Sequence, residues 1–206
     1  MNNCKLAEVI VFAGPNGSGK SSLTKLIKPV NMIYINADDI KRVNMCSDLE
    51  AALFAEEQRE NCVKNGQSFC FETVMSTTRN LDLLKRAKEN NFFVRSHIVV
   101  TIDSRINVSR VRGRVESGGH DVPEDKIISR YTKSLNLVKD VVKVSDICNI
   151  YDNSSLYPFR FFKKRKSEYF YQRYSLWPLE QIKKLTGIDN IQRRIYNLSA
   201  TAHSKK

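Results

Sequence analysis

The stretch that decides the fold of this chain is Gly14-Pro15-Asn16-Gly17-Ser18-Gly19-Lys20-Ser21. It fits the pattern G-x-x-x-x-G-K-[ST], in which the glycines let backbone N–H groups curl around a phosphate. An apolar run over 7–12 precedes the loop, and a helical pattern over 21–27 follows it. A strand before such a loop and a helix after it predict a phosphate-binding site, because the start of the helix adds partial positive charge.

This loop predicts which nucleotide groups are held. Lys20 can reach the β- and γ-phosphates, and the Ser21 hydroxyl can coordinate Mg²⁺. The sequence has no N-K-x-D element of the GTPase kind, which favours ATP over GTP. The predicted ATP-binding residues are the loop, its next residue and an asparagine after the last predicted strand, namely Gly14, Pro15, Asn16, Gly17, Ser18, Gly19, Lys20, Ser21, Ser22 and Asn153.

The pattern outside the loop predicts the fold. Apolar runs at 32–36, 68–72, 93–102 and 146–151 read as further strands, and helical patterns at 37–43, 48–64, 77–90, 105–116 and 123–141 alternate with them. Such alternation predicts an α/β protein with a mostly parallel five-stranded sheet and helices on both faces, the three-layer P-loop kinase fold. We expect a kinase core over 1–154, with a helical lid at about 105–141.

The last quarter of the chain has a different composition. Residues 155–206 carry 12 Lys/Arg against 3 Asp/Glu, out of a net charge of +12 for the whole chain. We expect a basic appendage of the same domain, with a hairpin (157–163 and 169–174) and short helices (178–186 and 190–198). Aromatic and basic residues interleave over 159–174. That pattern is typical of a single-strand nucleic-acid platform or of an edge hairpin with its aromatic residues packed inward, and we favour the hairpin.

Composition excludes several protein classes. No stretch of the 206 residues approaches the ~20 apolar residues of a membrane helix, and no signal-peptide pattern is present. The five cysteines are scattered and odd in number, which predicts reduced thiols in a cytoplasmic protein. No pair among the three histidines has zinc-ligand spacing. A basic surface favours anionic partners such as nucleotides or nucleotide sugars.

Three further segments, taken with the loop, resemble the zeta-toxin family of toxin–antitoxin kinases. They are Ile35-Asn36-Ala37-Asp38-Asp39-Ile40, Phe71-Glu72-Thr73, and the run from Arg110 to Pro123 that contains Gly118-Gly119-His120; Asp152-Asn153-Ser154 closes the pattern. The resemblance covers about 9–154. It implies an ATP- and Mg²⁺-dependent kinase of a UDP-activated amino sugar such as UDP-N-acetylglucosamine, phosphorylated on the 3′-hydroxyl. It also implies an antitoxin partner that blocks the ATP site.

The candidate catalytic residues are Lys20, Asp38, Arg110 and Arg114. Asp38 matches the family's catalytic aspartate and could accept the proton of the acceptor hydroxyl, although a first-turn acid of a helix is the structural alternative. Arg110 and Arg114 are one helical turn apart in the predicted lid and could neutralise charge on the transferred phosphoryl group. Arg112 is out of phase with them.

The candidate substrate-binding residues are Asn36, Glu72, Thr73, His120 and Arg130. The family uses a glutamate at the position of Glu72 to hold the sugar, whereas a helix-capping acid is the alternative. Asp103, after the strand over 93–102, could act on magnesium-bound water or cap the next helix.

Two other functions stay open at this point. The acceptor could be NAD, a nucleoside or a hydroxy acid. In the second alternative the chain is an ATP-binding, nucleic-acid-associated protein. We expect a nucleotide-sugar substrate, no membrane or nucleic-acid partner, and a monomer when the protein is free of an antitoxin.

Overall fold

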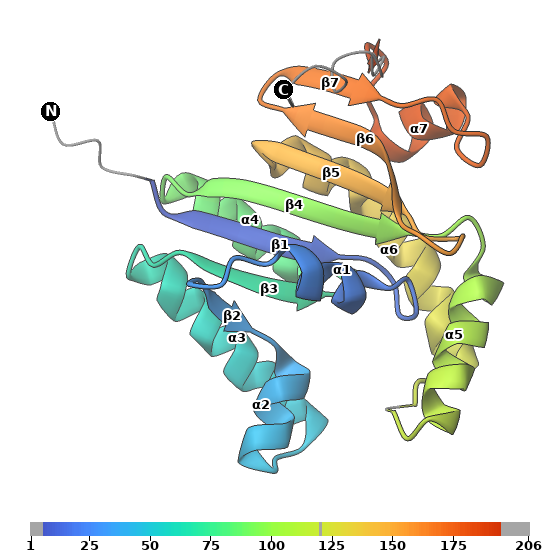
Figure 1. Ribbon diagram of the computed structural model, residues 1–206. Coiled ribbons are helices and arrows are strands. Elements are labelled where there is room, and N and C mark those ends of the chain that lie inside the picture. Colours follow the sequence, from blue (N-terminus) through green and yellow to red (C-terminus); the bar gives the residue numbers. More distant parts are fainter. Residues whose placement is uncertain (1–5, 120, 195–206) are drawn as a thin grey trace, which may run out of the picture.

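The computed structural model describes residues 6–119 and 121–194, and in this part of the chain one twisted sheet runs through the molecule (Figure 1). Its strands follow the spatial order β2-β3-β1-β4-β5-β6-β7-β8. Their bounds are β1 Glu8–Ala13, β2 Ile33–Ile35, β3 Phe69–Thr73, β4 Phe93–Val100, β5 Ile147–Asp152, β6 Phe159–Arg165, β7 Glu168–Tyr171 and β8 Gln192–Arg193.

The expectation of a mostly parallel five-stranded sheet is wrong. The five predicted strands β2, β3, β1, β4 and β5 do pair in parallel, but β6 then pairs antiparallel with β5 and β7 antiparallel with β6. The predicted hairpin therefore continues the main sheet, which is mixed and has eight strands in the described residues. The helix expected over 190–198 is also wrong where it can be checked, because Gln192–Arg193 pairs with β7 as β8.

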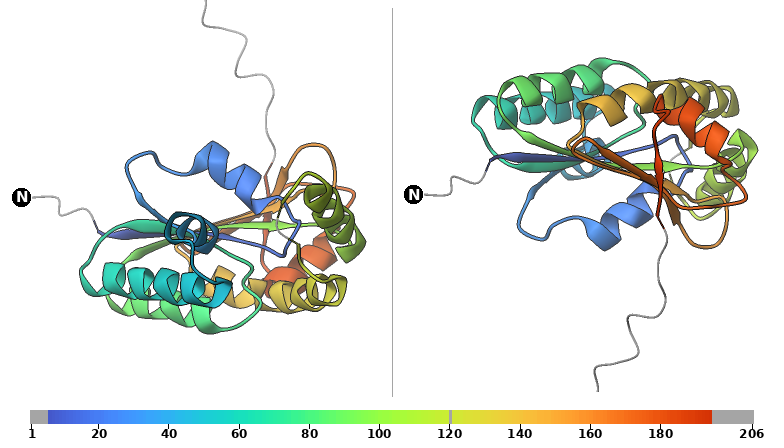
Figure 2. Two further views of the ribbon diagram at one scale, coloured as in Figure 1. Left: turned by 90° about the horizontal axis from the view of Figure 1, so that it is seen from below. Right: turned by 90° about the horizontal axis from the view of Figure 1, so that it is seen from above.

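The helices cover the two faces of the sheet unequally. They are α1 Lys20–Ile27, α2 Ala37–Asn44, α3 Asp48–Lys64, α4 Arg79–Glu89, α5 Ser104–Glu116, α6 Glu124–Val144 and α7 Leu179–Thr186. Figure 2 shows the sheet nearly edge-on, with α1 on one side and α3, α4, α6 and α7 on the other. α1 packs on β1 and β3. The three-layer α/β arrangement of a P-loop kinase is therefore present, with one helical layer much larger than the other.

Three apolar clusters lie in the described residues, the smallest of them at Ile10, Phe12 and Cys70, and the other two hold most of the helices. The larger one lies between the sheet and the large helical layer and includes Val11, Phe71, Val94 and Val142. The smaller one joins α5 to the start of α6 through Val108, Val111, Val122 and Ile127. Since Val138, Val141 and Val142 of α6 belong to the larger cluster, only α5 and the first part of α6 form a separately packed unit. No helix in the described residues is long and apolar enough to cross a membrane.

A buried carboxylate ties the C-terminal section to the core. Asp152, at the end of β5, is 0% exposed. Its Oδ1 accepts hydrogen bonds from Trp177 Nε1 (3.0 Å) and from Ser154 Oγ (2.6 Å). Its Oδ2 accepts one from the Tyr174 hydroxyl (3.0 Å). Hydrogen bonds to a buried charge are among the stronger ones, so this residue explains why 155–194 folds onto the kinase core.

We therefore expect Asp152→Ala to lower the free energy of unfolding by about 3 kcal/mol, because it leaves the buried Trp177 donor without its acceptor and removes the hydrogen bond from the half-buried Tyr174 hydroxyl. The midpoint Tm should fall by about 6–12 °C. Thermal and urea unfolding would measure both. Asp140→Ala is the matched control, since the Asp140 carboxylate is partly exposed and lies 3.9 Å from Lys143. Equal stability of the two variants would contradict an anchoring role for Asp152.

Candidate active site

The predicted site residues meet at one edge of the sheet. In the parallel part of the sheet, β1 has β3 on one side and β4 on the other, so the order in which successive strands are added to the sheet reverses at β1. Ligands of open α/β sheets bind outside the carboxyl ends of the strands at such a point. The phosphate loop follows β1, Asp38 follows β2, Glu72 lies near the end of β3, and Asn153 follows β5.

The phosphate loop has a backbone that only glycine adopts without strain at two of its turns. Gly17 has φ 76° and Gly19 has φ 88°. A Cβ on Gly17 would lie 2.4 Å from the Asn107 carbonyl oxygen, and one on Gly19 would lie 2.1 Å from Asn153 Nδ2. Neither distance is sterically allowed, so the glycines serve both the left-handed turns and the close approach of two asparagines.

Those two asparagines hold the loop in place. Asn107 of α5 donates from Nδ2 to the Asn16 carbonyl oxygen at 2.6 Å, and Asn153 donates from Nδ2 to the Ser18 carbonyl oxygen at 2.8 Å. Ser18 Oγ is buried and has no hydrogen-bond partner in the described part of the chain. A buried hydroxyl without a partner in a ring of backbone N–H groups fits a phosphate oxygen.

Lys20 and Ser21 begin α1 directly after the loop. Burial lowers the pKa of Lys20, the positive charge of Arg114 lowers it further, and the carboxylates of Glu72 and Asp38 act in the opposite direction. The charges of Glu72, Asp38 and Arg114, which come from three different elements, therefore all act on the Lys20 ammonium. The site therefore combines one ammonium, one guanidinium and two carboxylates around the loop.

Glu72 is held in a hydrogen-bond chain. Its Oε2 accepts from Ser21 Oγ at 2.6 Å, and its Oε1 accepts from the Tyr34 hydroxyl at 2.7 Å. Asn36 Nδ2 donates to the same Tyr34 oxygen at 2.8 Å. Burial and the hydrogen bond to Glu72 raise the pKa of Tyr34, so the phenol stays protonated and keeps Glu72 oriented.

The Ser21 hydroxyl and the Glu72 carboxylate can each supply an oxygen ligand to a metal ion beside the phosphate loop. Magnesium in phosphoryl-transfer sites is bound by one or two protein oxygens, with phosphates and water completing the shell. The described residues contain no cluster of three or more His, Cys, Asp or Glu side chains that would make an all-protein cage. This donor set fits Mg²⁺ that arrives with a nucleotide.

Asp38 lies in the first turn of α2, and it does not cap that helix. The cap is Asn36, whose Oδ1 accepts from the Asp38 N–H at 2.9 Å. The Asp38 side chain is exposed, whereas its neighbour Asp39 binds Arg42 at 2.8 Å. The carboxylate of Asp38 is thus open to solvent beside Lys20, where an acceptor hydroxyl could reach it.

One face of α5 is turned toward the loop. Asn107, Arg110 and Arg114 repeat at intervals of three and four residues, which places them on one side of the helix. Asn107 touches the loop, Arg110 reaches the Ser155 carbonyl oxygen at 3.4 Å, and Arg114 acts on Lys20. Arg112 points the other way and pairs with Glu124 of α6.

The other predicted residues have separate places. Thr73 Oγ1 accepts from the Met75 N–H and from Asn80 Nδ2, both at 2.9 Å, so its hydroxyl is used in the turn after β3. Arg130 is half-buried on α6, and Ser22 is exposed on α1. Asp103 caps α5 by accepting from the Arg105 N–H at 2.8 Å. His120 lies outside the described residues.

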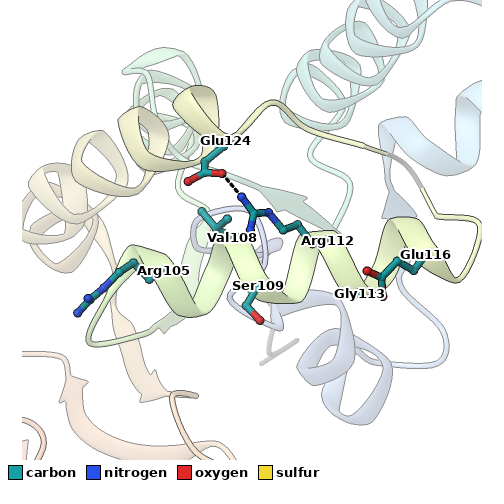
Figure 3. A pocket seen from close by; sticks show the side chains of 7 residues that line it. All are labelled: Arg105, Val108, Ser109, Arg112, Gly113, Glu116 and Glu124. Carbon is teal, nitrogen blue, oxygen red and sulfur yellow. Dashed lines mark hydrogen bonds and ion pairs between the residues drawn. The ribbon is translucent and has the colours of Figure 1, made fainter.

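A hollow of about 440 Å³ lies along the outer side of α5 (Figure 3). Its lining comes from α5 and Glu124, and the Arg112–Glu124 ion pair crosses its wall. The residues of this hollow are not those of the loop-facing stripe of α5. We therefore assign the site to the phosphate loop, and the hollow to the packing of α5 against α6.

Two functional positions were not predicted from the sequence. Tyr34 lies between Ile33 and Ile35 in a short strand. In the sequence, only its hydroxyl distinguishes it from an aromatic residue of the core. Asn107 is fully buried on α5, where an amide is unfavourable unless it is hydrogen-bonded. A buried asparagine in a helix that follows the fourth strand is a signal that could have been used.

No known family profile matches the sequence. An uncharacterized protein of Haemophilus influenzae (strain Rd) is 32% identical over 129 residues, which make up 60% of this chain and 92% of that protein. The chain therefore belongs to the same family as the Haemophilus influenzae protein.

Solved structures share the fold at low sequence identity. A chain of the AvrRxo1-ORF1:AvrRxo1-ORF2 complex with ATP superposes with a TM-score of 0.68 and 13% identity over 87% of this chain. This chain spans 63% of the length of that one. A chain of the PezAT chromosomal toxin–antitoxin system of Streptococcus pneumoniae gives a TM-score of 0.51 and 15% identity, with 75% and 72% of the two chains covered. These likenesses establish a P-loop kinase-like fold.

Proposed function

We propose that this protein is a phosphotransferase that uses ATP and Mg²⁺. It would transfer the terminal phosphoryl group to the sugar 3′-hydroxyl of a UDP-activated amino sugar such as UDP-N-acetylglucosamine. The observation that carries the proposal is the meeting of Lys20, Glu72, Asp38 and Arg114 at the phosphate loop, from α1, β3, α2 and α5. Structures of similar fold include a complex with ATP and a toxin–antitoxin system, which agrees with this class.

The residues divide the work between donor and acceptor. The loop N–H groups and Lys20 would hold the β- and γ-phosphates, while Ser21 and Glu72 would hold Mg²⁺, which neutralises charge on the phosphates when bound. Asp38 would accept the proton of the attacking hydroxyl, because its carboxylate is exposed and its charge acts on Lys20 at the loop. Arg110 and Arg114 would close over the transferred group from α5. Asn36 and Arg130 remain proposed contacts of the sugar nucleotide.

The acceptor assignment rests on the motif resemblance and on charge. The chain carries a net charge of +12, which favours an acceptor that already bears a diphosphate. A protein partner that covers the ATP site, as an antitoxin would, is part of the same proposal. Such a partner would have to reach the loop between α2 and α5, the two helices that project from the carboxyl edge of the sheet (Figure 1).

Product analysis tests the acceptor. Wild-type protein with ATP and Mg²⁺ should convert UDP-N-acetylglucosamine into a product heavier by one phosphoryl group, and phosphorus NMR should place the new ester on the sugar. Asp38→Asn keeps the shape and removes the base, so it should bind both substrates and form little product. A panel of NAD, nucleosides and hydroxy acids runs in parallel. Phosphorylation of one of these, with no UDP-sugar product, would overturn the acceptor assignment and leave the kinase assignment standing.

A further inference from the structure

The face of the sheet that carries α1 is polar and basic over β4 to β7. α1 packs on β1 and β3, while α4, α6 and α7 lie on the opposite face (Figure 2). The β4–β7 part of the α1 face is turned toward the viewer in Figure 1. We call it the open face. Three rows of cross-strand neighbours make it up, and their side chains point to the same side because paired residues in a sheet share a face.

The strand register defines the rows. The first runs Arg95, Ile147, Arg165, Glu168; the second runs His97, Asn149, Lys163, Phe170; the third runs Val99, Tyr151, Arg160. Phe93 extends the open face along β4 from Arg95. Basic and aromatic side chains are therefore interspersed with Ile147, Asn149 and Val99 across four adjacent strands. Neighbouring strands are about 4.8 Å apart. Val99, His97 and Asn149 are only 1%, 9% and 5% exposed, so solvent reaches this face at Arg95, Ile147, Tyr151 and the β6 and β7 residues.

A bulge in β6 produces this arrangement. The pairing of β5 with β6 shifts between Ile150 and Tyr151, which leaves Phe161 without a partner on β5. Phe161 and Phe162 are both buried on the side of α7, where Phe161 stacks on Trp177. Strict alternation would have turned one of the two phenylalanines outward. With the bulge, Arg160 and Lys163 on either side of the pair both lie on the open face.

The aromatic groups of the open face are preorganised. Tyr151 stacks against His97 with 6.0 Å between ring centroids, and the guanidinium of Arg95 lies 5.7 Å above the Phe93 ring. Burial, with the charges of Arg95 and Arg160 nearby, lowers the pKa of His97 to about 4, so the ring is neutral at physiological pH. Phe93, Tyr151 and Phe170 are half-buried, so each is fixed in place and still offers part of its ring to solvent.

The charge of the open face is unbalanced. It carries four basic side chains, Arg95, Arg160, Lys163 and Arg165. The acidic residues beside them are Glu168 in the first row and Glu8, which binds Arg95 at 2.7 Å. A polyanion that approaches the rows of β5 and β6 therefore meets net positive charge.

We infer that the open face binds single-stranded nucleic acid, with bases stacked on Tyr151, Phe170 and Phe93 and with phosphates near Arg160, Lys163 and Arg165. Aromatic rings on a sheet surface between basic side chains are what single-strand platforms require, since every base has a face to stack and every nucleotide has a phosphate to neutralise. This binding is separate from the phosphate loop and differs from the sequence-based expectation of no nucleic-acid partner. The aromatic residues that pack inward, such as Phe161 and Phe162, take no part in it.

Fluorescence anisotropy with labelled U15 and dT15 tests the inference on the full chain. We expect both oligonucleotides to bind at 50 mM salt and to bind about 18-fold more weakly at 200 mM, which corresponds to three neutralised phosphates on a single strand. Preference for U15 or for dT15 separates RNA from DNA as the natural ligand. A duplex of equal length should bind more weakly, because its bases are not free to stack.

Variants separate this face from the general charge of the protein. Arg160→Glu/Lys163→Glu should weaken U15 binding by at least about 10-fold, and Phe170→Ala by about 5–10-fold. The matched control is Lys133→Glu/Lys184→Glu, which makes the same charge change at exposed positions of α6 and α7 on the opposite face. The U15 affinity of this control should stay within about 2-fold of the wild-type affinity, because only the long-range effect of the lower net charge remains. Circular dichroism confirms that each variant is folded.

Three outcomes would overturn the inference. One is the absence of oligonucleotide binding at 50 mM salt, and another is equal weakening by the two charge-reversal pairs. The third is competition by poly-aspartate as strong as by U15, with Phe170→Ala unchanged, because an acidic protein segment would then be the partner that fits this face.

Discussion

Lys20→Ala should reduce ATP turnover by at least about 10³-fold, since it removes the ammonium that follows the loop directly and that interacts with the Glu72 and Asp38 carboxylates. In the wild-type protein, Lys20 neutralises Glu72 and Asp38 as well as the nucleotide. Without it, both carboxylates would face the triphosphate uncompensated. The loss should therefore appear in nucleotide binding and in the rate of transfer.

The measurement is a coupled ATPase or kinase assay, with ATP affinity determined by titration calorimetry. Lys25→Ala is the matched control, because Lys25 is exposed and lies in the last turn of the same helix, at the end opposite to the loop. The two variants should have the same far-UV circular dichroism and similar Tm, as neither ammonium is part of the apolar core. Normal turnover by folded Lys20→Ala protein would contradict the assignment of the site.

Much of the fold could be predicted because local and global signals agree in the first 154 residues. The helix expected over 48–64 is present as Asp48–Lys64, where Ser47 and Glu50 form a reciprocal capping box. The strands before and after the loop are short, apolar and bounded by polar turns, which is the pattern of buried parallel strands. For these elements, tertiary contacts do not override the sequence pattern.

The mixed part of the sheet could not be predicted from the same signals. Whether a hairpin stands alone or extends a sheet depends on contacts between β5 and β6, and nothing local in the sequence 159–165 specifies them.

Lys164 is an example of a residue whose environment the sequence does not reveal. It looks like a solvated charge, yet it is 7% exposed and donates to the Val142 carbonyl oxygen at the end of α6 (2.7 Å). A lysine that satisfies a helix end through a sheet cannot be recognised without the tertiary structure.

The candidate site also has a part that the sequence predicts and a part that it does not. Strand ends and the loop pattern predict that Lys20, Ser21, Asp38 and Glu72 meet, because parallel strands finish at one edge. The orientation of Glu72 by Tyr34, and of the loop by Asn107, depends on hydrogen bonds between elements that are 38 and 91 residues apart in sequence. Such contacts follow from how the elements pack, and only the structure provides them.

The second large effect is expected on α5. Arg114→Ala should lower kcat by about 10² or more while ATP affinity changes much less, because the guanidinium would act mainly on charge that develops in the transition state. The Arg114 side chain is exposed near the end of α5, and its charge acts on Lys20. If α5 and the start of α6 close over the loop as the predicted lid, the Arg114 guanidinium would reach the transferred phosphoryl group.

Arg112→Ala is the control for charge on the same helix, since Arg112 pairs with Glu124 on the other side of α5. Single-turnover rates and ATP Kd for the two variants distinguish a transition-state contact from an anchor of the nucleotide. If Arg114→Ala raises Kd and leaves kcat unchanged, Arg114 binds the ground state. Arg110 would then be the residue to test for the transition state, because it lies one turn earlier on the same face and has a buried Nη1 atom with no partner in the described residues.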